Sequence, residues 1–228
     1  AALEDACDGI DELHRVQFGA NGSRAVYPER IDRDELQSFL TRRPDDAESL
    51  REPRTALLPR GNGYGTAPYT ERYQPELEKI AQALTNAADR AEHSSLSSYL
   101  RSCAAAMRTD DFAAAEEAWG RGPGSLLLAW FGPSTVEVDE VTGVKTGYEG
   151  WIARRDPSGS LLMAELGTAV RSWEARLAAE PKLAFDLPDI HVVDDLRRAG
   201  ALRGSDRRIA ILPHDEELRA AEGRVLVY

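Results

Sequence analysis

Through the first 120 residues, apolar side chains recur every three to four positions, the spacing of one face of an α-helix. Leu3, Ile10 and Leu13 begin this pattern. A Pro- and Gly-rich stretch over residues 44–68 interrupts it and predicts a β-hairpin. The elements expected in this half are a helix over 1–18, a short helix over Asp32–Arg42, hairpin strands over Arg54–Leu58 and Tyr64–Ala67, a long helix with Pro75 in its first turn, a helix from Ser94 or Ser95, and a helix from Thr109 to about Gly120.

After Gly122-Pro123-Gly124 the pattern changes to that of strands. Residues 125–131 are an unbroken apolar run typical of a buried strand, while residues 134–140 and 144–153 alternate between apolar and polar. The segment 158–179 returns to helical spacing, with an apolar stripe made of Leu161, Leu162, Leu166, Val170, Trp173 and Leu177. Three further strands are expected over Ile190–Leu196, Arg207–Leu212 and Arg224–Tyr228.

Helices first and strands afterwards indicate an α+β protein, with a helical N-terminal half packed on a small mixed β-sheet or β-barrel. We expect a helical part over residues 1–122 and a β-barrel-like part with one long helix over residues 123–228. A chain of 228 residues buries roughly 70% of its unfolded surface, so both parts can share one compact domain.

The chain is acidic, which narrows its partners. It holds 28 Lys and Arg against 39 Asp and Glu, a formal net charge of −11. Phosphate backbones and anionic lipid surfaces both require a basic face, so nucleic acid and membrane are not expected partners. No apolar run reaches the ~18 residues of a membrane span, and no signal-peptide pattern opens the chain. We therefore expect a cytoplasmic protein.

The sequence offers no recognisable metal or cofactor motif. HExxH, Walker-type, GxSxG and strand-following GxGxxG patterns are all absent. The four histidines are not at metal-ligand spacing, and Cys7 and Cys103 are too few for a disulfide framework or zinc knuckle. We expect two reduced buried thiols, no metal and no cofactor.

Carboxylates and one histidine are the candidates for proton transfer. Glu137, Asp139, Glu140 and Glu149 lie on or between two adjacent expected strands, where Glu137 or Asp139 could approach Lys145 or Glu149 across the ladder. An inward-pointing carboxylate would have a raised pKa and could serve as a general acid or base. The alternative is the polar outer face of a half-buried sheet. The candidate catalytic residues are Glu137, Asp139, Glu149, Asp194 and His214.

Aromatic residues of the strand-rich half could line a ligand pocket, although such residues more often fill a core. His191 lies near Asp194, and its simpler interpretation is a solvent-facing strand position. The candidate ligand-binding residues are Trp130, Lys145, Tyr148, Trp151 and His191.

Several segments, in order along nearly the whole chain, resemble one family. They are Tyr27-Pro28-Glu29-Arg30-Ile31, Pro68–Tyr73, Met107–Phe112, Gly132-Pro133, Gly143-Val144-Lys145, Val192-Val193-Asp194, Ala199-Gly200 and Ile209–Glu216. Together they resemble the bacterial branch of the dipeptidyl peptidase III-like zinc hydrolases. The resemblance implies helices wrapped on a small β-barrel.

The sequence also departs from this family. The resemblance implies zinc ligands in a helical lobe whose HExxGH-type motif would follow residue 228. Where the family uses a Glu and a Tyr on the peptide, this chain has Thr135 and Glu137. The family's N-x-P-N-like segment reads Ile211-Leu212-Pro213-His214 here, without either Asn. We therefore do not expect zinc dipeptidyl peptidase activity from this chain alone.

The favoured interpretation is a metal-independent enzyme that processes a small molecule by acid/base cyclisation, isomerisation or elimination, for example in bacterial specialised metabolism. Two alternatives remain. One is a non-catalytic ligand- or peptide-binding or regulatory module. The other is a half-enzyme that needs a separate zinc-bearing part, and it predicts an exposed apolar patch. The expected partners are a small-molecule ligand or substrate and, in addition, another protein or a second copy.

Overall fold

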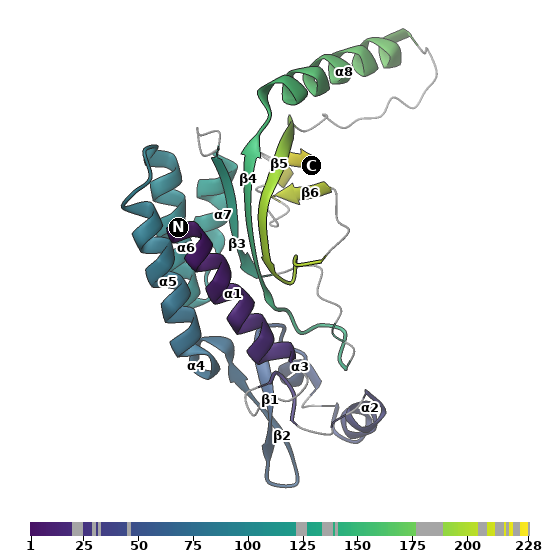
Figure 1. The fold of residues 1–228 in the computed structure, drawn as a ribbon. Helices are drawn as coiled ribbons and strands as arrows, with labels where there is room; N and C mark the ends of the chain where they lie inside the picture. Colours follow the sequence, from purple (N-terminus) through teal and green to yellow (C-terminus); the bar gives the residue numbers. More distant parts are fainter. Residues whose placement is uncertain are drawn as a thin grey trace.

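The computed structural model shows an α+β protein, as the sequence predicted. Helices α1, α5, α6 and α7 lie on one side of a five-stranded sheet, with a small hairpin at one end and helix α8 at the other (Figure 1). The residues that the structure describes are 1–19, 25–28, 31, 33–44, 47–121, 127–133, 139, 141–176, 189–204, 209–212, 217, 219–220 and 224–227.

The helical layer is held by one apolar face from each helix. In α1, Ala6, Ile10 and Leu13 are fully buried, and they pack with Ile80 and Leu84 of α5 in the main core. Burial of each large aliphatic side chain contributes about 1.5–3 kcal/mol. The helices are α1 (Ala2–Phe18), α2 (Arg33–Arg42), α3 (Ala47–Leu50), α4 (Tyr69–Arg72), α5 (Gln74–Ala88), α6 (Ser94–Thr109) and α7 (Ala113–Gly120).

The boundary between α6 and α7 differs from the prediction. Thr109 was expected to start a helix, but it is the last residue of α6, because Asp110 adopts a left-handed conformation with φ 64° and ends that helix. The next helix begins at Ala113, whose amide donates to the Asp111 carboxylate over 3.1 Å.

The predicted hairpin is present as strands β1 (Thr55–Arg60) and β2 (Gly63–Pro68). Their antiparallel register leaves a two-residue turn, in which Gly61 has φ 58°. Phe39 of α2 packs edge-on against Tyr64 at a ring distance of 5.0 Å, within a second, smaller core. This contact attaches the hairpin to α2.

The main sheet is mixed and open. Its strand order is β3-β4-β5-β7-β6, and only the β5–β7 pair is parallel. Among the described strands, β3 and β6 lie at opposite edges, so the barrel considered from the sequence is not closed. The strands are β3 (Leu127–Pro133), β4 (Tyr148–Arg155), β5 (Asp189–Gly200), β6 (Ile209–Leu212) and β7 (Arg224–Val227).

Strand β4 starts later than predicted and is buried on both faces. The sequence indicated a strand over 144–153, but residues 144–147 form a loop. Every residue from Tyr148 to Ala153 is buried, because α1 packs on the sheet here: a Cβ on Gly150 would lie 3.1 Å from Ile10. Of the strand expected over 134–140, Asp139 is in a turn, and residues 134–138 and 140 lie outside the described residues.

Helix α8 (Pro157–Arg176) confirms the helix expected over 158–179, but its apolar stripe does not pack into the core. Leu161, Leu162, Leu166, Val170 and Trp173 are all exposed. Within the part of the chain that the structure describes, no helix is long and apolar enough to cross a membrane.

Candidate functional site

Lys145 is at the centre of a polar cluster where β1, the loop before β4 and the α6–α7 junction meet. Its side chain is fully buried, and its ammonium donates to the Glu52 carbonyl over 2.7 Å and to the Thr55 hydroxyl over 2.8 Å. Burial lowers the pKa of Lys145 to about 8, although the nearby Asp139 carboxylate favours the charged form. Lys145 can therefore exchange a proton close to neutral pH.

Asp139 organises the loop that carries Lys145. Its carboxylate accepts hydrogen bonds from the Tyr27 hydroxyl over 2.5 Å, from the Thr142 hydroxyl, and from the backbone amides of residues 141, 142, 144 and 145. Burial opposes the charged form, but the hydrogen bonds outweigh it, so the pKa of Asp139 is lowered. A carboxylate held in this way is suited to fixing a loop rather than to taking a proton.

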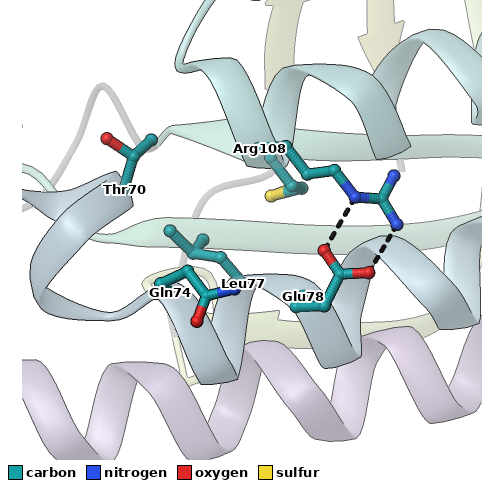
Figure 2. A pocket seen from close by; sticks show the side chains of 6 residues that line it. Thr70, Gln74, Leu77, Glu78 and Arg108 are labelled. Carbon is teal, nitrogen blue, oxygen red and sulfur yellow. Dashed lines mark hydrogen bonds and ion pairs between the residues drawn. The ribbon is translucent and has the colours of Figure 1, made fainter.

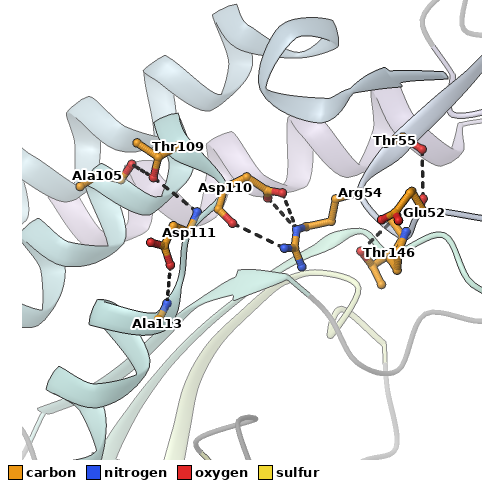
Figure 3. Close-up of polar contacts among 10 residues, drawn as sticks. Glu52, Arg54, Thr55, Ala105, Thr109, Asp110, Asp111, Ala113 and Thr146 are labelled. Carbon is orange, nitrogen blue, oxygen red and sulfur yellow. Dashed lines mark hydrogen bonds and ion pairs between the residues drawn. The ribbon is translucent and has the colours of Figure 1, made fainter. Parts of the chain in front are cut away.

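An ion pair joins the hairpin to the left-handed turn after α6 (Figure 3). Arg54 Nε lies 2.7 Å from a carboxylate oxygen of Asp110, and Arg54 Nη2 lies 3.5 Å from the Asp110 carbonyl oxygen. The Thr146 amide donates to the Pro53 carbonyl over 3.0 Å, beside this pair. Sequence reasoning missed Arg54 and Asp110, because their contact joins residues 56 positions apart.

Two tyrosines line the interior side of this cluster. The rings of Tyr69 and Tyr148 lie 6.3 Å apart, and both hydroxyls are buried without a hydrogen-bond partner in the structure. Burial raises the pKa of Tyr148, and the neighbouring Asp110 carboxylate raises it further. Both tyrosines therefore stay neutral and can donate a hydrogen bond to a water or a small polar group.

Of the predicted residues, Asp139 and Lys145 are joined by the hydrogen bond from the Lys145 amide, while the charged neighbours of Tyr148 are Asp110 and Arg54. The side chains of Trp130 and Trp151 are buried in the main core, where Trp130 meets Trp119 edge-on at 6.2 Å. Trp151 Nε1 donates to the Asp195 carboxylate over 3.0 Å. A ligand role for the two tryptophans stays a prediction.

The remaining predicted residues lie on β4 and β5 or outside the described residues. Glu149 is buried on β4, with Gly132 and Gly200 as its neighbours across the strands. Asp194 is exposed and pairs with Arg154 at 2.8 Å. His191 is half-buried on β5. Glu137 and His214 lie outside the described residues. The substitutions noted at 135, 137 and 211–214 also fall where no side chain is described.

A small pocket opens between α4, α5 and α6, and none of the predicted residues is among those that line it in the described part of the chain (Figure 2). Its volume is about 180 Å³, and Arg108 pairs with Glu78 along one wall at 2.7 Å. Ligand pockets usually enclose about 300–1,000 Å³, so this one suits only a small group. Its lining residues are Thr70, Gln74, Leu77, Glu78, Met107 and Arg108.

The donor set does not fit a metal ion. Over the described residues, no three His, Cys, Asp or Glu side chains gather closely enough to bind one. Cys7 and Cys103 are buried free thiols, and burial raises the pKa of each to about 12, which makes both poor ligands and nucleophiles.

Comparison with known proteins identifies solved structures that have a similar fold. No family model matches the sequence. The chain is similar to dipeptidyl peptidase III of Caldithrix abyssi, with a TM-score of 0.80 at 21% identity, over 99% of this chain and 53% of that one. It is also similar to the dipeptidyl-peptidase III of Corallococcus sp. strain EGB, with a TM-score of 0.71 at 22% identity and the same coverage.

The sequence itself is 27% identical over 197 residues to Nudix hydrolase 3 of Arabidopsis thaliana, which covers 83% of this chain and 25% of that protein. The chain thus spans about half of the bacterial structures and a quarter of the plant protein. It has a dipeptidyl peptidase III-like fold, as the resemblance implied, and it matches just over half of the length of those structures.

Proposed function

We propose that this chain is the metal-free half of a two-part hydrolase on a dipeptidyl peptidase III-like scaffold. It would hold part of the substrate, and hydrolysis would need the other half of the fold. One observation carries this proposal: nearly all of the chain superposes on just over half of two bacterial dipeptidyl peptidase III structures.

The state of the candidate acids and bases supports the same proposal. Asp139 is occupied by six hydrogen bonds, and Asp194 is in an exposed ion pair. Among the described residues, the donors for a metal ion are not assembled either. A hydrolase made from this fold would therefore take its reactive centre from outside the described residues.

The test compares the chain alone with a chimera in which the chain replaces the matched part of the Caldithrix abyssi enzyme. The readout is release of a fluorogenic amine from a dipeptidyl substrate and from its N-acetylated form. We expect no hydrolysis by the chain alone, with or without added divalent metal, and hydrolysis by the chimera. The resemblance implies that residues with which the family holds the peptide are replaced at 135, 137 and 211–214, so the chimera should discriminate less than the parent against the acetylated substrate.

Two results would contradict the proposal. Hydrolysis by the chain alone would show that it carries a complete active site. A chimera that folds but hydrolyses neither substrate would show that this half serves another purpose.

A metal-independent small-molecule enzyme is the second candidate, and Lys145 is the observation that favours it. Its pKa of about 8 suits proton transfer near neutral pH, and its buried ammonium is held by the Glu52 carbonyl and the Thr55 hydroxyl. Native mass spectrometry of the gently purified chain tests this candidate. A discrete retained molecule that is lost in the Lys145→Met variant, but kept in Lys79→Met, would favour the second candidate over the first.

A further inference from the structure

Helix α8 carries a continuous apolar seam that faces solvent. Leu162, Leu166, Ala169 and Trp173 follow one another at intervals of four, three and four residues, which places them in a row along the helix. All four are exposed, and 58% of Leu162 and 72% of Trp173 is accessible to solvent. Leu161 and Val170 flank the row and are exposed too, so the seam is wide enough to receive a partner element.

The first turn of α8 is fixed to the sheet, so the seam has a defined direction. The Ser160 hydroxyl donates to the Asp156 carbonyl over 2.7 Å and accepts from the Val192 amide over 3.1 Å. The Asp156 amide in turn donates to the Val192 carbonyl over 2.8 Å. At Gly159 the helix approaches β5 so closely that a Cβ would lie 2.9 Å from the Val192 side chain. Beyond this turn, α8 extends away from the sheet (Figure 1).

The sheet also exposes an apolar residue at its outer edge. Ile209 of edge strand β6 is 52% exposed. It pairs with Val227, and Val227 pairs with Val192, the residue that the first turn of α8 approaches.

The size and charge of this surface favour one occupant. A stable interface between two separate proteins takes about 20–30 residues from each side. The exposed surface described here has far fewer large apolar residues than that. Two copies of the chain, each with a net charge of −11, would also repel each other. In contrast, α8 contains two acidic and two basic residues and is neutral. A small and neutral apolar surface suits a contact with a part of the protein that is already joined to this half, because such a contact needs neither a large area nor charge attraction.

We infer that the seam of α8 is the docking surface for the missing half of the dipeptidyl peptidase III-like fold, which would place an apolar surface over it. This inference rests on the proposed function, because it assumes that the other half is present and joined to this one in a single chain, as in the matched structures. The matched structures contain that additional half, since 53% of each is accounted for here.

Hydrogen exchange measured by mass spectrometry tests the inference on two samples: the full 228-residue chain and the Caldithrix chimera described above. We expect the amides of α8 to exchange at least about ten-fold more slowly in the chimera. The double variant L166S/W173S should abolish this protection. The control A164S/R171S, at exposed positions on the opposite side of the same helix, should keep it, because it also introduces two Ser residues without touching the seam.

Each other result overturns the inference. Equal α8 exchange in both samples, with the added half exchanging as in the parent enzyme, shows that the other half docks elsewhere. An added half that exchanges as an unfolded chain shows that this half offers it no matching surface. A free chain that sediments as a dimer, and becomes a monomer with L166S/W173S, shows that a second copy is the occupant. Hydrolysis is read separately, so a protected α8 without hydrolysis would contradict the proposed function and leave the docking surface standing.

Discussion

At the residue scale, the chemistry of the candidate site depends on long-range partners. The sequence suggested that Glu137 or Asp139 could approach Lys145 or Glu149 across two paired strands. In the structure the Lys145 backbone amide donates to the Asp139 carboxylate over 3.1 Å within one loop. The sequence could not show that the Lys145 ammonium reaches Glu52 and Thr55, which lie about 90 positions earlier. Burial at that position lowers the pKa of Lys145, and the charges of Asp139 and Glu52 oppose this shift only in part.

The low pKa of Lys145 predicts a pH dependence of stability. Lys145 titrates near 10.5 when unfolded and near 8 in the fold, so between these values the unfolded chain binds more protons. The contribution of this group to the free energy of unfolding therefore increases as the pH rises from about 8 to about 10. Denaturant unfolding should show wild type gaining stability relative to Lys145→Met over this range. Lys79→Met, which changes an exposed lysine, should run parallel to wild type.

At the element scale, the strand β5 ends where three elements crowd together. Gly200 has φ 61°, and a Cβ there would lie 2.1 Å from the Tyr148 carbonyl oxygen and 2.6 Å from Ile10. The Gly200 amide donates to Asp11 over 2.8 Å. Periodicity predicted strands and helices here, but it gave no indication of this close approach, which depends on how α1 lies across β4 and β5.

Gly200→Ala should lower the free energy of unfolding by about 2 kcal/mol or more, because the left-handed backbone costs about 1–2 kcal/mol and the methyl group also collides with backbone. Gly61→Ala is the matched control. Gly61 has φ 58°, and a Cβ there would have no atom within 4 Å. Gly61→Ala should therefore lower the free energy of unfolding only by the cost of the left-handed backbone. Equal losses in urea unfolding of the two variants would contradict the packing argument.

At the scale of the whole molecule, α1 joins the helical part to the sheet. Asp11, only 10% exposed at its side chain, lies 3.0 Å from Arg197 and 3.1 Å from Arg203 in addition to its bond with the Gly200 amide. This junction supports the expectation that residues 1–122 and 123–228 unfold together, as one domain.

Thermal unfolding followed by far-UV circular dichroism and by tryptophan fluorescence should therefore give coincident single transitions. Asp11→Ala should destabilise the protein by about 2 kcal/mol, because it removes an acceptor from the partly buried Arg197 and from the Gly200 amide. Glu12→Ala, at an exposed neighbouring position, should change stability by no more than about 0.5 kcal/mol. Two separated transitions in wild type would show two domains instead.

The sequence alone determined the class of the protein and the place of most elements, because helical and strand periodicities are local properties: the 1–18 helix, the hairpin and the order of helices before strands all followed from them. It also carried the ordered motifs that resemble the dipeptidyl peptidase III-like family. The tertiary structure alone decided which apolar stripes find a partner. Those of α1 and α8 look alike in sequence, yet Ile10 is buried and Leu166 is exposed. Burial depends on what packs against a face, and periodicity records only that the face is apolar.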